Sequence, residues 1–379
     1  MELTSRRGQR SGTRTAVTSA LSAEDPQAMA IDEPTPGPAE AASSVMFSFL
    51  IPAYRTEHLI GETLDSLLAQ TRGDWEAVVV DNGNSEEMAA VVRPYTQDPR
   101  VRLVRQENRG YAGGVNAAAE VARGRWFVPL CSDDLVLPDY CERMAAAVAA
   151  NPGVHALSPD AQVFDETDRQ VRALTFVELS GVMRQRVPRG DLTLADLMNQ
   201  QFLYYGSAFR RDAWQALGGH HSDTPRVEDL DLWLRLVVGG WSVRAVPDVL
   251  GCWRLREDSM SHAADGVDEF EAEAERAFTR AAKVSGRPED LAALDVAVRR
   301  LRYRSAIRRA RLSFLAGDDA TARKAACAAL QAHATLRALT ILAGVSVAPG
   351  ALRRIWPLKQ QATARIGRVM ARVRGRRAV

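Results

Sequence analysis

The chain has 379 residues, which is enough for about two or three domains of roughly 100 to 200 residues each. Apolar residues make up 46% and charged residues 25%, a balance typical of soluble globular proteins that argues against a disordered or collagen-like chain. The sequence has no run of about 18 apolar residues, so a membrane-spanning helix is not expected. The 4 cysteines show no CxxC spacing, which argues against a disulfide framework or a zinc site and favours a reducing compartment.

The formal net charge of +2 hides an uneven distribution along the chain. After Asp319 the sequence contains twelve Lys and Arg residues and no Asp or Glu, so residues 1–319 carry a net charge of −10. The protein therefore combines an acidic body with a basic C-terminal tail. A basic tail of this kind suits an anionic partner, such as a lipid surface or a nucleic acid.

The first segment in chain order shows no apolar periodicity. Residues 1–44 are rich in Ser, Thr, Ala and Pro and end in a Pro-rich run, which predicts a disordered N-terminal extension. A secretory signal peptide needs an apolar stretch after its basic residues, and none follows Arg6, Arg7 and Arg10. We therefore expect the protein to stay in the cytoplasm.

From Val45 onward, short apolar runs alternate with amphipathic stretches, a pattern that predicts an α/β fold with a mostly parallel sheet and flanking helices. In the first half of this domain, assigned to residues 45–265, we predict strands at Met46–Ile51, Ala77–Val80, Val101–Val104 and Trp126–Leu130 and helices at Ile60–Gln70, Glu86–Val92 and Val115–Ala122. In its less regular second half we predict strands at Val154–Leu157, Ser207–Arg210 and Val249–Arg254 and helices at Ala213–Leu217 and Asp229–Val238.

The chain after this domain is predicted to be helical. Residues 266–350 form a helical C-terminal region, with helices at Glu269–Lys283, Leu291–Leu315 and Ala320–Leu330. The apolar run within Leu336–Pro349 is too short to span a bilayer and suits a core helix or an interfacial segment. Residues 351–379 form a basic amphipathic tail whose apolar residues and arginines suit an interfacial helix on anionic lipid. A solvated tail explains the same composition, and nothing else in the chain supports nucleic-acid binding.

In open α/β sheets, ligands bind beyond the carboxyl ends of the parallel strands. The predicted strands of the first half are followed by polar or turn-forming residues at Pro52–Tyr54, Asp81–Gly83, Asn108–Gly114 and Ser132–Asp134. Adjacent carboxylates such as Asp133 and Asp134 suit Mg2+ or Mn2+, which prefer oxygen ligands and keep coordination positions open for phosphate oxygens. Capping of the next helix or turn is the alternative role for these aspartates and for Asp81.

A second carboxylate pair, Glu228 and Asp229, opens a predicted amphipathic helix. A helix N-terminus stabilises an ionised carboxylate, which suits a general base, although ordinary helix starts have the same composition. The nearby His220 and His221 either contact an acceptor or lie in a loop without a catalytic role.

Taken in order, these segments resemble family 2 glycosyltransferases over about residues 46–262. The motifs that carry the resemblance are Ser48–Tyr54, Ser66–Thr71, Trp75–Gly83, Asn108–Asn116, Ser132–Asp134, Gly218–Gly219, Glu228–Arg235 and Trp253–Arg254. No single motif is decisive, but the ordered set is specific. The resemblance implies a GT-A fold, a divalent cation (Mg2+ or Mn2+), a nucleotide-diphospho-sugar donor and inversion of the anomeric carbon.

The resemblance also implies roles for individual residues. Asp134 and Asp133 would ligate the metal, and Asp229 would be the general base that takes the proton from an acceptor hydroxyl. The nucleoside pocket would be lined by Pro52, Ala53, Tyr54 and Asp81, and the donor site would be completed by Asn108, Gly110, Asn116, Asp133, Arg254 and Arg256.

Three positions depart from the usual pattern of this family. Arg55 stands where many relatives have Asn, Cys131 where many have Asp or Asn, and Arg256 where a His is common. Cys131 is a poor ligand for a hard cation, so Asp133 and Asp134 remain as the acidic pair. The guanidinium of Arg256 matches phosphate geometry and suits a diphosphate, or is a solvated loop charge.

The sequence thus predicts a metal-dependent, inverting glycosyltransferase in cell-surface glycan or polysaccharide biosynthesis. Its expected partners are the donor, a glycan or lipid-linked acceptor and, through the basic tail, an anionic membrane surface, with the protein peripheral on the inner face of the membrane. The alternative is a non-catalytic scaffold or glycan-binding protein on the same fold. A nucleotidyltransferase would need a Gly-rich, basic phosphate loop after the first strand, which Pro52–Arg55 does not resemble.

Overall fold

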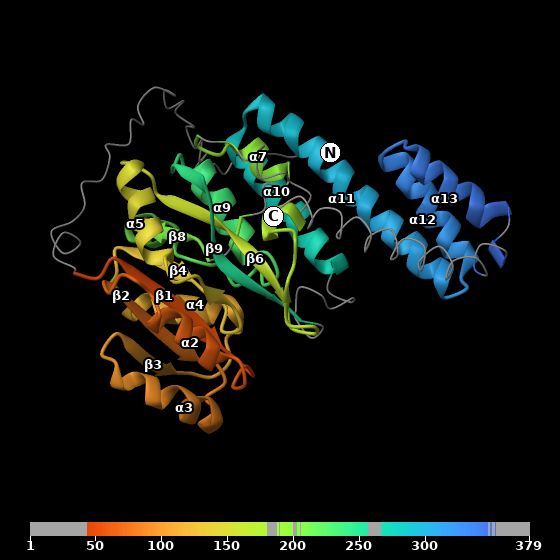
Figure 1. Cartoon of the computed structure of the whole chain (residues 1–379). Coiled ribbons are helices and arrows are strands. Elements are labelled where there is room, and N and C mark those ends of the chain that lie inside the picture. The colour runs from red at the N-terminus through yellow and green to blue at the C-terminus, as the bar shows by residue number, and fades with distance from the viewer. Residues whose placement is uncertain are drawn as a thin grey trace, which may run out of the picture. The chain divides into compact units, whose positions relative to one another are not determined.

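The computed structural model describes residues 44–179, 188, 190–199, 203–204, 206–256, 267–347, 349–350 and 353. The predicted N-terminal extension, apart from Ser44, and the predicted basic tail, apart from Arg353, lie outside these residues. Within the described chain, nine strands form one sheet flanked by helices, and a helical region follows it in sequence (Figure 1). The predicted α/β class and the helical C-terminal region are confirmed.

The first four strands are parallel neighbours in the order β3-β2-β1-β4. The elements of this half are β1 (Phe47–Ala53), α2 (Ile60–Leu68), β2 (Trp75–Asp81), α3 (Glu86–Val92), the 3-10 turn η1 (Arg93–Gln97), β3 (Val101–Arg105), α4 (Gly110–Val121) and β4 (Trp126–Pro129). The predicted strands are confirmed to within two residues at each end. The carboxyl ends of β1 and β2 are level, because Ala53 pairs with Asp81.

Helix α4 begins at Gly110, five residues before the predicted start at Val115. The turn predicted for Asn108–Gly114 is therefore wrong from Gly110 onward. Gly110 has a left-handed backbone with φ of 71°, and a Cβ on Gly114 would lie 2.7 Å from the Cβ of Pro52. The glycines thus let the first turn of the helix approach the end of β1, which outweighs their low helix propensity.

The second half of the sheet continues from β4 in the order β8-β6-β9-β5, with β7 paired to β6. Its elements are β5 (Leu135–Val136), α5 (Tyr140–Ala150), β6 (Ala156–Asp165), β7 (Gln170–Val171), α6 (Phe176–Leu179), α7 (Leu194–Met198), β8 (Ala208–Arg210), α8 (Arg211–Leu217), α9 (Glu228–Val238) and β9 (Val243–Leu255). The antiparallel pairs span two residues each, whereas the parallel pairs are longer, so the sheet is mostly parallel as predicted.

Strands β6 and β9 are both longer than the sequence predicts, and α5, α6, α7, β5 and β7 were not predicted at all. The register of the β6–β9 pair shifts on both sides of Asp160, where Pro159 and Pro247 lie. Proline lacks the N–H that a central strand donates and is tolerated at such bulges. Because of these two prolines, the sequence predicts two short strands where the structure has one long parallel pair.

Alternating side chains of the central strands enter two separate cores. Phe49 and Ile51 of β1 pack with helices α2, α3 and α5, whereas Leu50 between them packs with α4, α9 and α10. This alternation places helices on both faces of the sheet (Figure 1). It leaves the carboxyl ends of β1, β2 and β4 as the edge at which the candidate site residues gather.

The C-terminal helices are α10 (Val267–Ser285), α11 (Pro288–Leu315), α12 (Asp319–Ala332) and α13 (Leu336–Val347). Alanines and Phe278 of α10, with Ala293 and Ala297 of α11, pack in the same core as α4 and α9. The rest of α11 packs with α12 and α13 in three small clusters. In the part of the chain that is described, every helix is too short or too polar to cross a lipid bilayer.

Candidate functional site

Asp81 ends strand β2 in a buried position, with 1% of its surface exposed. Its Oδ2 accepts a hydrogen bond from Arg105 Nε at 3.2 Å, and Arg105 Nη1 donates to Glu86 Oε1 at 2.7 Å. One guanidinium therefore connects the ends of β2 and β3 to the first turn of α3. The structure places the predicted nucleoside residue Asp81 at the strand edge, with its carboxylate oriented by Arg105.

Asn82, the next residue, connects this edge to the start of α4. Its Nδ2 donates to the carbonyl of Gly110 at 2.8 Å, and its Oδ1 accepts from Gln106 Nε2 at 2.8 Å. The Oδ1 of Asn108 accepts from the N–H of Gly110, also at 2.8 Å. Asn82 thus brings the predicted donor residues Asn108 and Gly110 to the end of β2. The sequence predicted Asn82 only as part of a turn. Its role could not be predicted, because its buried amide contacts residues that are distant in the chain.

The residues that end β1 have two different surroundings. Pro52 and Ala53 are buried within the strand, whereas Tyr54 is 43% exposed. The Tyr54 ring covers Gly83, where a Cβ would lie only 3.1 Å from the ring. Arg55 has a left-handed φ of 57° and places its guanidinium 5.1 Å from the ring centroid of Tyr54. The edge of the sheet here presents an aromatic face beside a cation.

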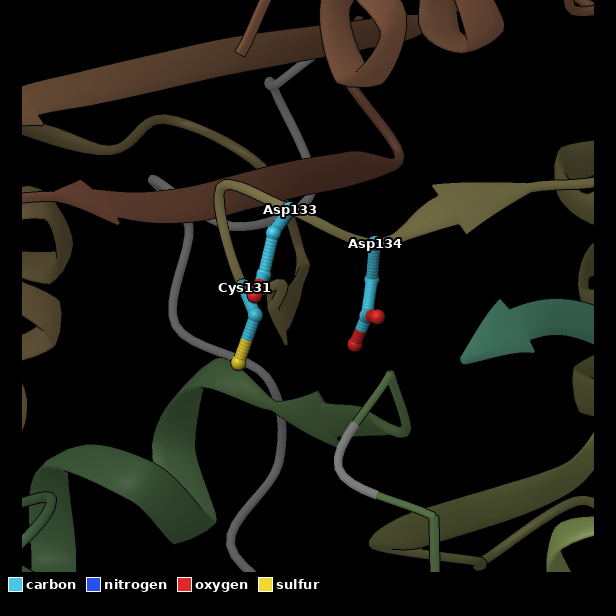
Figure 2. A group of neighbouring side chains, drawn as sticks. All are labelled: Cys131, Asp133 and Asp134. Atoms are coloured by element: carbon cyan, nitrogen blue, oxygen red, sulfur yellow. The ribbon is translucent and has the colours of Figure 1, made fainter. Parts of the chain in front are cut away.

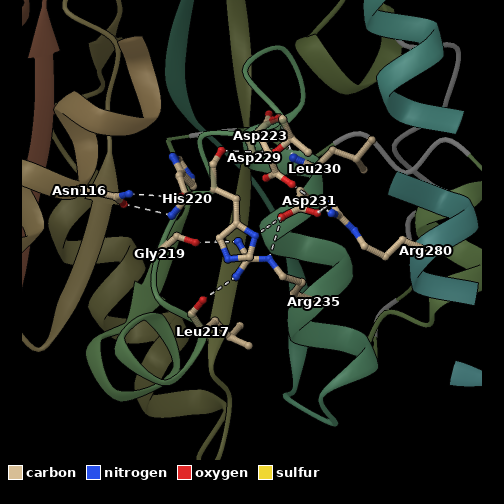
Figure 3. A network of polar contacts seen from close by, with 12 residues as sticks. Asn116, Leu217, Gly219, His220, Asp223, Asp229, Leu230, Asp231, Arg235 and Arg280 are labelled. Carbon is tan, nitrogen blue, oxygen red and sulfur yellow. Dashed lines mark hydrogen bonds and ion pairs between the residues drawn. The ribbon is translucent and has the colours of Figure 1, made fainter. Parts of the chain in front are cut away.

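Asn116 of α4 contacts the loop that precedes α9. Its Nδ2 donates to the carbonyl of His220 at 2.7 Å, and its Oδ1 accepts from the N–H of His220 at 3.0 Å. Figure 3 shows this pair of bonds between the two residues. Asn116 therefore holds the loop backbone by a two-way contact, which is a structural role that the motif alone does not reveal.

Cys131, Asp133 and Asp134 form a cluster in the turn between β4 and β5. One ligand atom from each residue lies within 4.8 Å of the others, and the three side chains leave the turn on the same side (Figure 2). Asp134 is buried, whereas Cys131 and Asp133 are partly exposed. The two carboxylates supply the oxygen ligands that Mg2+ and Mn2+ prefer, and the softer Cys131 thiol does not. The residues of the turn therefore fit a hard divalent cation.

Arg254 of β9 contacts this turn and fixes its position. Its backbone N–H donates to Asp134 Oδ1 at 2.7 Å, and its side-chain Nε donates to the carbonyl of Asp133 at 2.7 Å. The rest of its guanidinium bonds Glu62 Oε2 at 2.6 Å and Glu166 Oε2, and the side chain is fully buried. Protein oxygens of Asp133, Glu62 and Glu166 thus accept from the nitrogens of the Arg254 guanidinium, so this predicted donor residue orients the turn that contains Asp133 and Asp134.

Arg256 lies two residues further and contacts the same turn. Its Nη1 is 3.0 Å from Asp133 Oδ2, and its side chain is 13% exposed. A guanidinium at this place can neutralise an aspartate or bind phosphate oxygens that approach the turn. The structure therefore brings the predicted residues Asp133, Asp134, Arg254 and Arg256 together.

Glu228 and Asp229 are the first residues of α9 and are both partly buried. Burial raises the pKa of Asp229, against the effect of the Leu230 N–H, which donates to Asp229 Oδ1 at 2.6 Å. Burial and the neighbouring charge of Asp229 together raise the pKa of Glu228 well above its ordinary value. Among the described residues, no cationic side chain forms an ion pair with either carboxylate. This pair is therefore arranged to take up a proton.

Tyr111 of α4 lies near both groups of acidic side chains. The thiol of Cys131 lies 3.9 Å from the Tyr111 hydroxyl. Burial, and then the charges of Cys131, Glu228 and Asp229, raise the pKa of Tyr111. Tyr111 therefore lies within electrostatic range of both the turn before β5 and the start of α9. In the sequence, Tyr111 is only one residue of the motif Asn108–Asn116, with no signal of its own.

His220 is 3% exposed and stacks on Tyr111, with ring centroids 6.0 Å apart, and against Trp214, with centroids 5.0 Å apart. Burial lowers its pKa to about 3, so the imidazole is neutral. Within the described chain, neither of its ring nitrogens has a hydrogen-bond partner. The histidine that the sequence left undecided is thus a buried ring between α4 and α8.

Comparison with known proteins gives one family and several related folds. A family model described as Glycosyl transferase family 2 matches residues 48–217. The succinoglycan biosynthesis protein ExoO of Rhizobium meliloti (strain 1021) is 29% identical over 244 residues, which cover 63% of this chain and 69% of that protein.

Two solved structures illustrate the likeness in fold. TarS 1–349 of S. aureus, in complex with UDP-GlcNAc, gives a TM-score of 0.57 at 16% identity, covering 84% of this chain and 92% of that one. The mannosyltransferase PcManGT from Pyrobaculum calidifontis, in complex with GDP-Man and Mn2+, gives 0.53 at 21% identity, covering 83% and 84%. At these identities the likeness concerns the fold, and it agrees with the sheet and helices described above.

Proposed function

The chain belongs to glycosyl transferase family 2 through residues 48–217, and from this premise we propose that it transfers a sugar from a nucleotide-diphospho-sugar donor to an acceptor hydroxyl, with inversion of the anomeric carbon. The observation that carries the proposal is the presence of two differently placed carboxylate groups. Asp133 and Asp134 lie in a turn held by arginines, and Asp229 lies at a helix start without a cationic partner among the described residues. The first group is suited to bind a divalent cation, and the second is suited to accept a proton from the acceptor hydroxyl.

The donor class is proposed from the arrangement of the strand edge and from related folds. TarS was solved with UDP-GlcNAc and PcManGT with GDP-Man. In this chain, the nucleoside would lie against the edge formed by Pro52, Ala53, Tyr54 and Asp81. The N-terminal turn of α4, where Gly110 bonds Asn82 and Asn108, would border the same donor. Asn116 would border it further along α4, where its amide holds the loop backbone at His220.

Asp133 and Asp134 would hold the divalent cation, Mg2+ or Mn2+. When bound, this cation neutralises the charge that develops on a leaving diphosphate. Arg254 orients the turn through its contacts with both aspartates, and Arg256 stands at Asp133, where its guanidinium would bind phosphate oxygens. PcManGT, whose fold is similar, was solved with Mn2+, which supports the proposed metal dependence.

Asp229 would act as the general base. Its carboxylate would take the proton of the acceptor hydroxyl while the hydroxyl oxygen attacks C1 of the sugar, opposite the departing diphosphate. A raised pKa makes the carboxylate a stronger base, which favours proton removal at neutral pH. Attack from the face opposite the leaving group is the reason that the anomeric carbon would be inverted.

The acceptor is proposed to be a growing glycan or a lipid-linked sugar in polysaccharide biosynthesis. The similarity to ExoO, which is named for succinoglycan biosynthesis, supports this class of pathway. In this proposal, residues 45–265 form the catalytic domain, residues 266–350 the helical region and residues 351–379 the basic tail.

A donor screen tests the proposal. The full chain is incubated with UDP-GlcNAc, GDP-mannose and other nucleotide sugars, with and without Mn2+, and release of the nucleoside diphosphate is measured. We expect one donor to be hydrolysed or transferred only in the presence of the cation. A protein that binds none of these donors by calorimetry in the presence of Mn2+ would be a scaffold rather than a transferase.

We also propose that the C-terminal end docks on an anionic membrane surface, with the protein peripheral on its inner face. Helix α13 exposes Leu336 (77%), Leu339 (51%) and Val347 (82%), and it is followed by a tail without any acidic residue. An apolar helix face that is followed in sequence by basic residues suits the lipid interface.

Vesicle sedimentation tests the membrane proposal. The full chain should bind vesicles that contain anionic phosphatidylglycerol at physiological salt and should not bind neutral phosphatidylcholine vesicles. The protein truncated after Gly350 should lose this binding. Equal binding of the two proteins to the anionic vesicles would contradict the proposed role of the tail.

A further inference from the structure

A buried carboxylate, Asp231, lies two residues after the proposed base and is contacted by two arginines. Asp231 is 1% exposed. Its Oδ2 accepts a hydrogen bond from Arg235 Nε at 2.7 Å, and its Oδ1 accepts one from Arg280 Nη2. Arg235 belongs to α9 itself, whereas Arg280 belongs to α10, as Figure 3 shows. His221 Nδ1 lies 3.5 Å from the same Oδ2.

Helix geometry places Asp229 and Asp231 on opposite sides of the first turn of α9. Each residue of an α-helix is rotated by about 100° from the previous one, so these two side chains point about 200° apart. Holding Asp231 on one side therefore fixes the direction of Asp229 on the other. The first turn needs such an anchor, because Val227 at the N-cap supplies no side-chain hydrogen bond to it.

Arg235 extends this anchor to the loop before α9. Its Nη1 donates to the carbonyl of Leu217 at 2.8 Å, and its Nη2 donates to the carbonyl of Gly219 at 2.6 Å. Gly218 and Gly219 have left-handed φ values of 72° and 67°, and a side chain on Gly219 would collide with Asn116 and Trp214. The loop, α9 and α10 are therefore joined around one buried carboxylate.

We propose that Arg280 is a positioning residue for sugar transfer: by holding Asp231, it fixes the first turn of α9 and thereby the direction of the Asp229 carboxylate. Arg280 lies outside residues 48–217, which the family model matches. The helical C-terminal region thus takes part in the reaction through α10. This inference rests on the proposed role of Asp229 as the base.

The test compares three variants of the full chain. Arg280→Met removes the charge, Arg280→Lys keeps it, and Arg276→Met is the control, because Arg276 lies one turn earlier on α10 with 69% of its side chain exposed and only a 3.9 Å contact to Glu273. The Arg280 side chain is itself 45% exposed, so its replacement leaves no fully buried cavity. The assay uses the nucleotide sugar that the wild type turns over in the donor screen.

We expect Arg280→Met to lower kcat at least tenfold while the donor KM changes less than twofold. Arg280→Lys should recover most of the loss, and Arg276→Met should match the wild type. A merely structural role of Arg280 would instead lower the amount of folded, active protein in Arg280→Met and leave kcat per active molecule unchanged. Unchanged kcat in Arg280→Met, measured beside an inactive Asp229→Asn, overturns this inference alone, whereas an active Asp229→Asn overturns the proposed function.

A second measurement needs no donor. Hydrogen exchange of the backbone amides at the start of α9 should be faster in Arg280→Met than in the wild type and unchanged in Arg276→Met. Equal protection in all three proteins overturns the inference. If Arg280→Met does not fold, Asp231→Asn takes its place, because it keeps the shape of the buried side chain and removes the charge that Arg280 contacts. It should show the same loss of kcat and the same faster exchange.

Discussion

Two groups of carboxylates, one in the turn before β5 and one at the start of α9, have opposite surroundings. In the turn, Asp133 contacts the guanidinium of Arg256, and Asp134 accepts a hydrogen bond from the backbone N–H of Arg254. At the start of α9, Glu228 and Asp229 have no ion-pair partner among the described residues, and burial raises the pKa of both. The arginines near α9 contact Asp231 instead.

The difference shows how the same residue type is prepared for different chemistry. A positive group or an N–H donor near a carboxylate favours its ionised form, which is the form that ligates a cation. Burial without a positive partner favours the protonated form and makes the carboxylate a stronger base. Arg235 of α9 and Arg280 of α10 contact Asp231 and form no ion pair with Asp229, so burial dominates at Asp229 and raises its pKa. Substitutions in either group can therefore break this contrast.

The largest effect is expected from removing the proposed base. Asp229→Asn cannot accept the acceptor proton, so kcat should fall by about 10²- to 10⁴-fold while the donor KM stays near its wild-type value. Steady-state kinetics with the donor found in the screen measure both quantities. The matched control is Asp295→Asn, at an aspartate of α11 whose side chain is 63% exposed. Near-normal turnover of Asp229→Asn would exclude the proposed mechanism.

A smaller effect is expected at the turn that we propose to hold the cation. Asp134→Asn keeps an oxygen to accept the N–H of Arg254 but loses the negative charge that a divalent cation needs. Donor affinity in the presence of Mn2+ should fall at least tenfold, and affinity without the metal should change little. Titration calorimetry with and without Mn2+ measures this difference, and Asp139→Asn, at a half-exposed aspartate five residues on, is the control. An unchanged metal-dependent affinity would remove Asp134 from the metal site.

The smallest effect concerns stability at Glu228. Since its pKa is raised in the folded protein, the folded state binds this proton more tightly than the unfolded state, whose pKa is about 4.3. The wild type is therefore most stable, relative to Glu228→Gln, below that unfolded-state pKa, and it loses this advantage as the pH rises through the folded-state pKa.

Urea unfolding of Glu228→Gln and the wild type at a series of pH values tests this sign. The unfolding midpoint of the variant should exceed that of the wild type at pH 7, and the two should converge or cross toward pH 4. Glu87→Gln, at an exposed glutamate of α3, should show no such trend. A wild type that becomes relatively more stable as the pH rises would show that the carboxylate is stabilised in its ionised form.

Several parts of the fold could be predicted because local patterns determine them. The apolar runs of β1, β2 and β4 are long enough to be buried on both faces, and the boundaries of α3 match the prediction exactly as Glu86–Val92. Other parts could not be predicted, because long-range packing overrides the local signal. The glycines at the start of α4 predicted a loop, although the helix begins there. The prolines of β6 and β9 predicted short strands, although the two strands form one long parallel pair.

The sequence by itself determined which residues carry charge and in what order they follow the strands, since motif spacing is a property of the chain. It therefore predicted the aspartates of the turn and the acidic start of α9. Only the tertiary structure decided the surroundings of each carboxylate. Arg254 reaches Asp134 across 120 residues of sequence, and Arg280 reaches Asp231 across 49. Contacts between such distant residues depend on how the sheet and helices pack, and these contacts decide whether a carboxylate is prepared for a cation or for a proton.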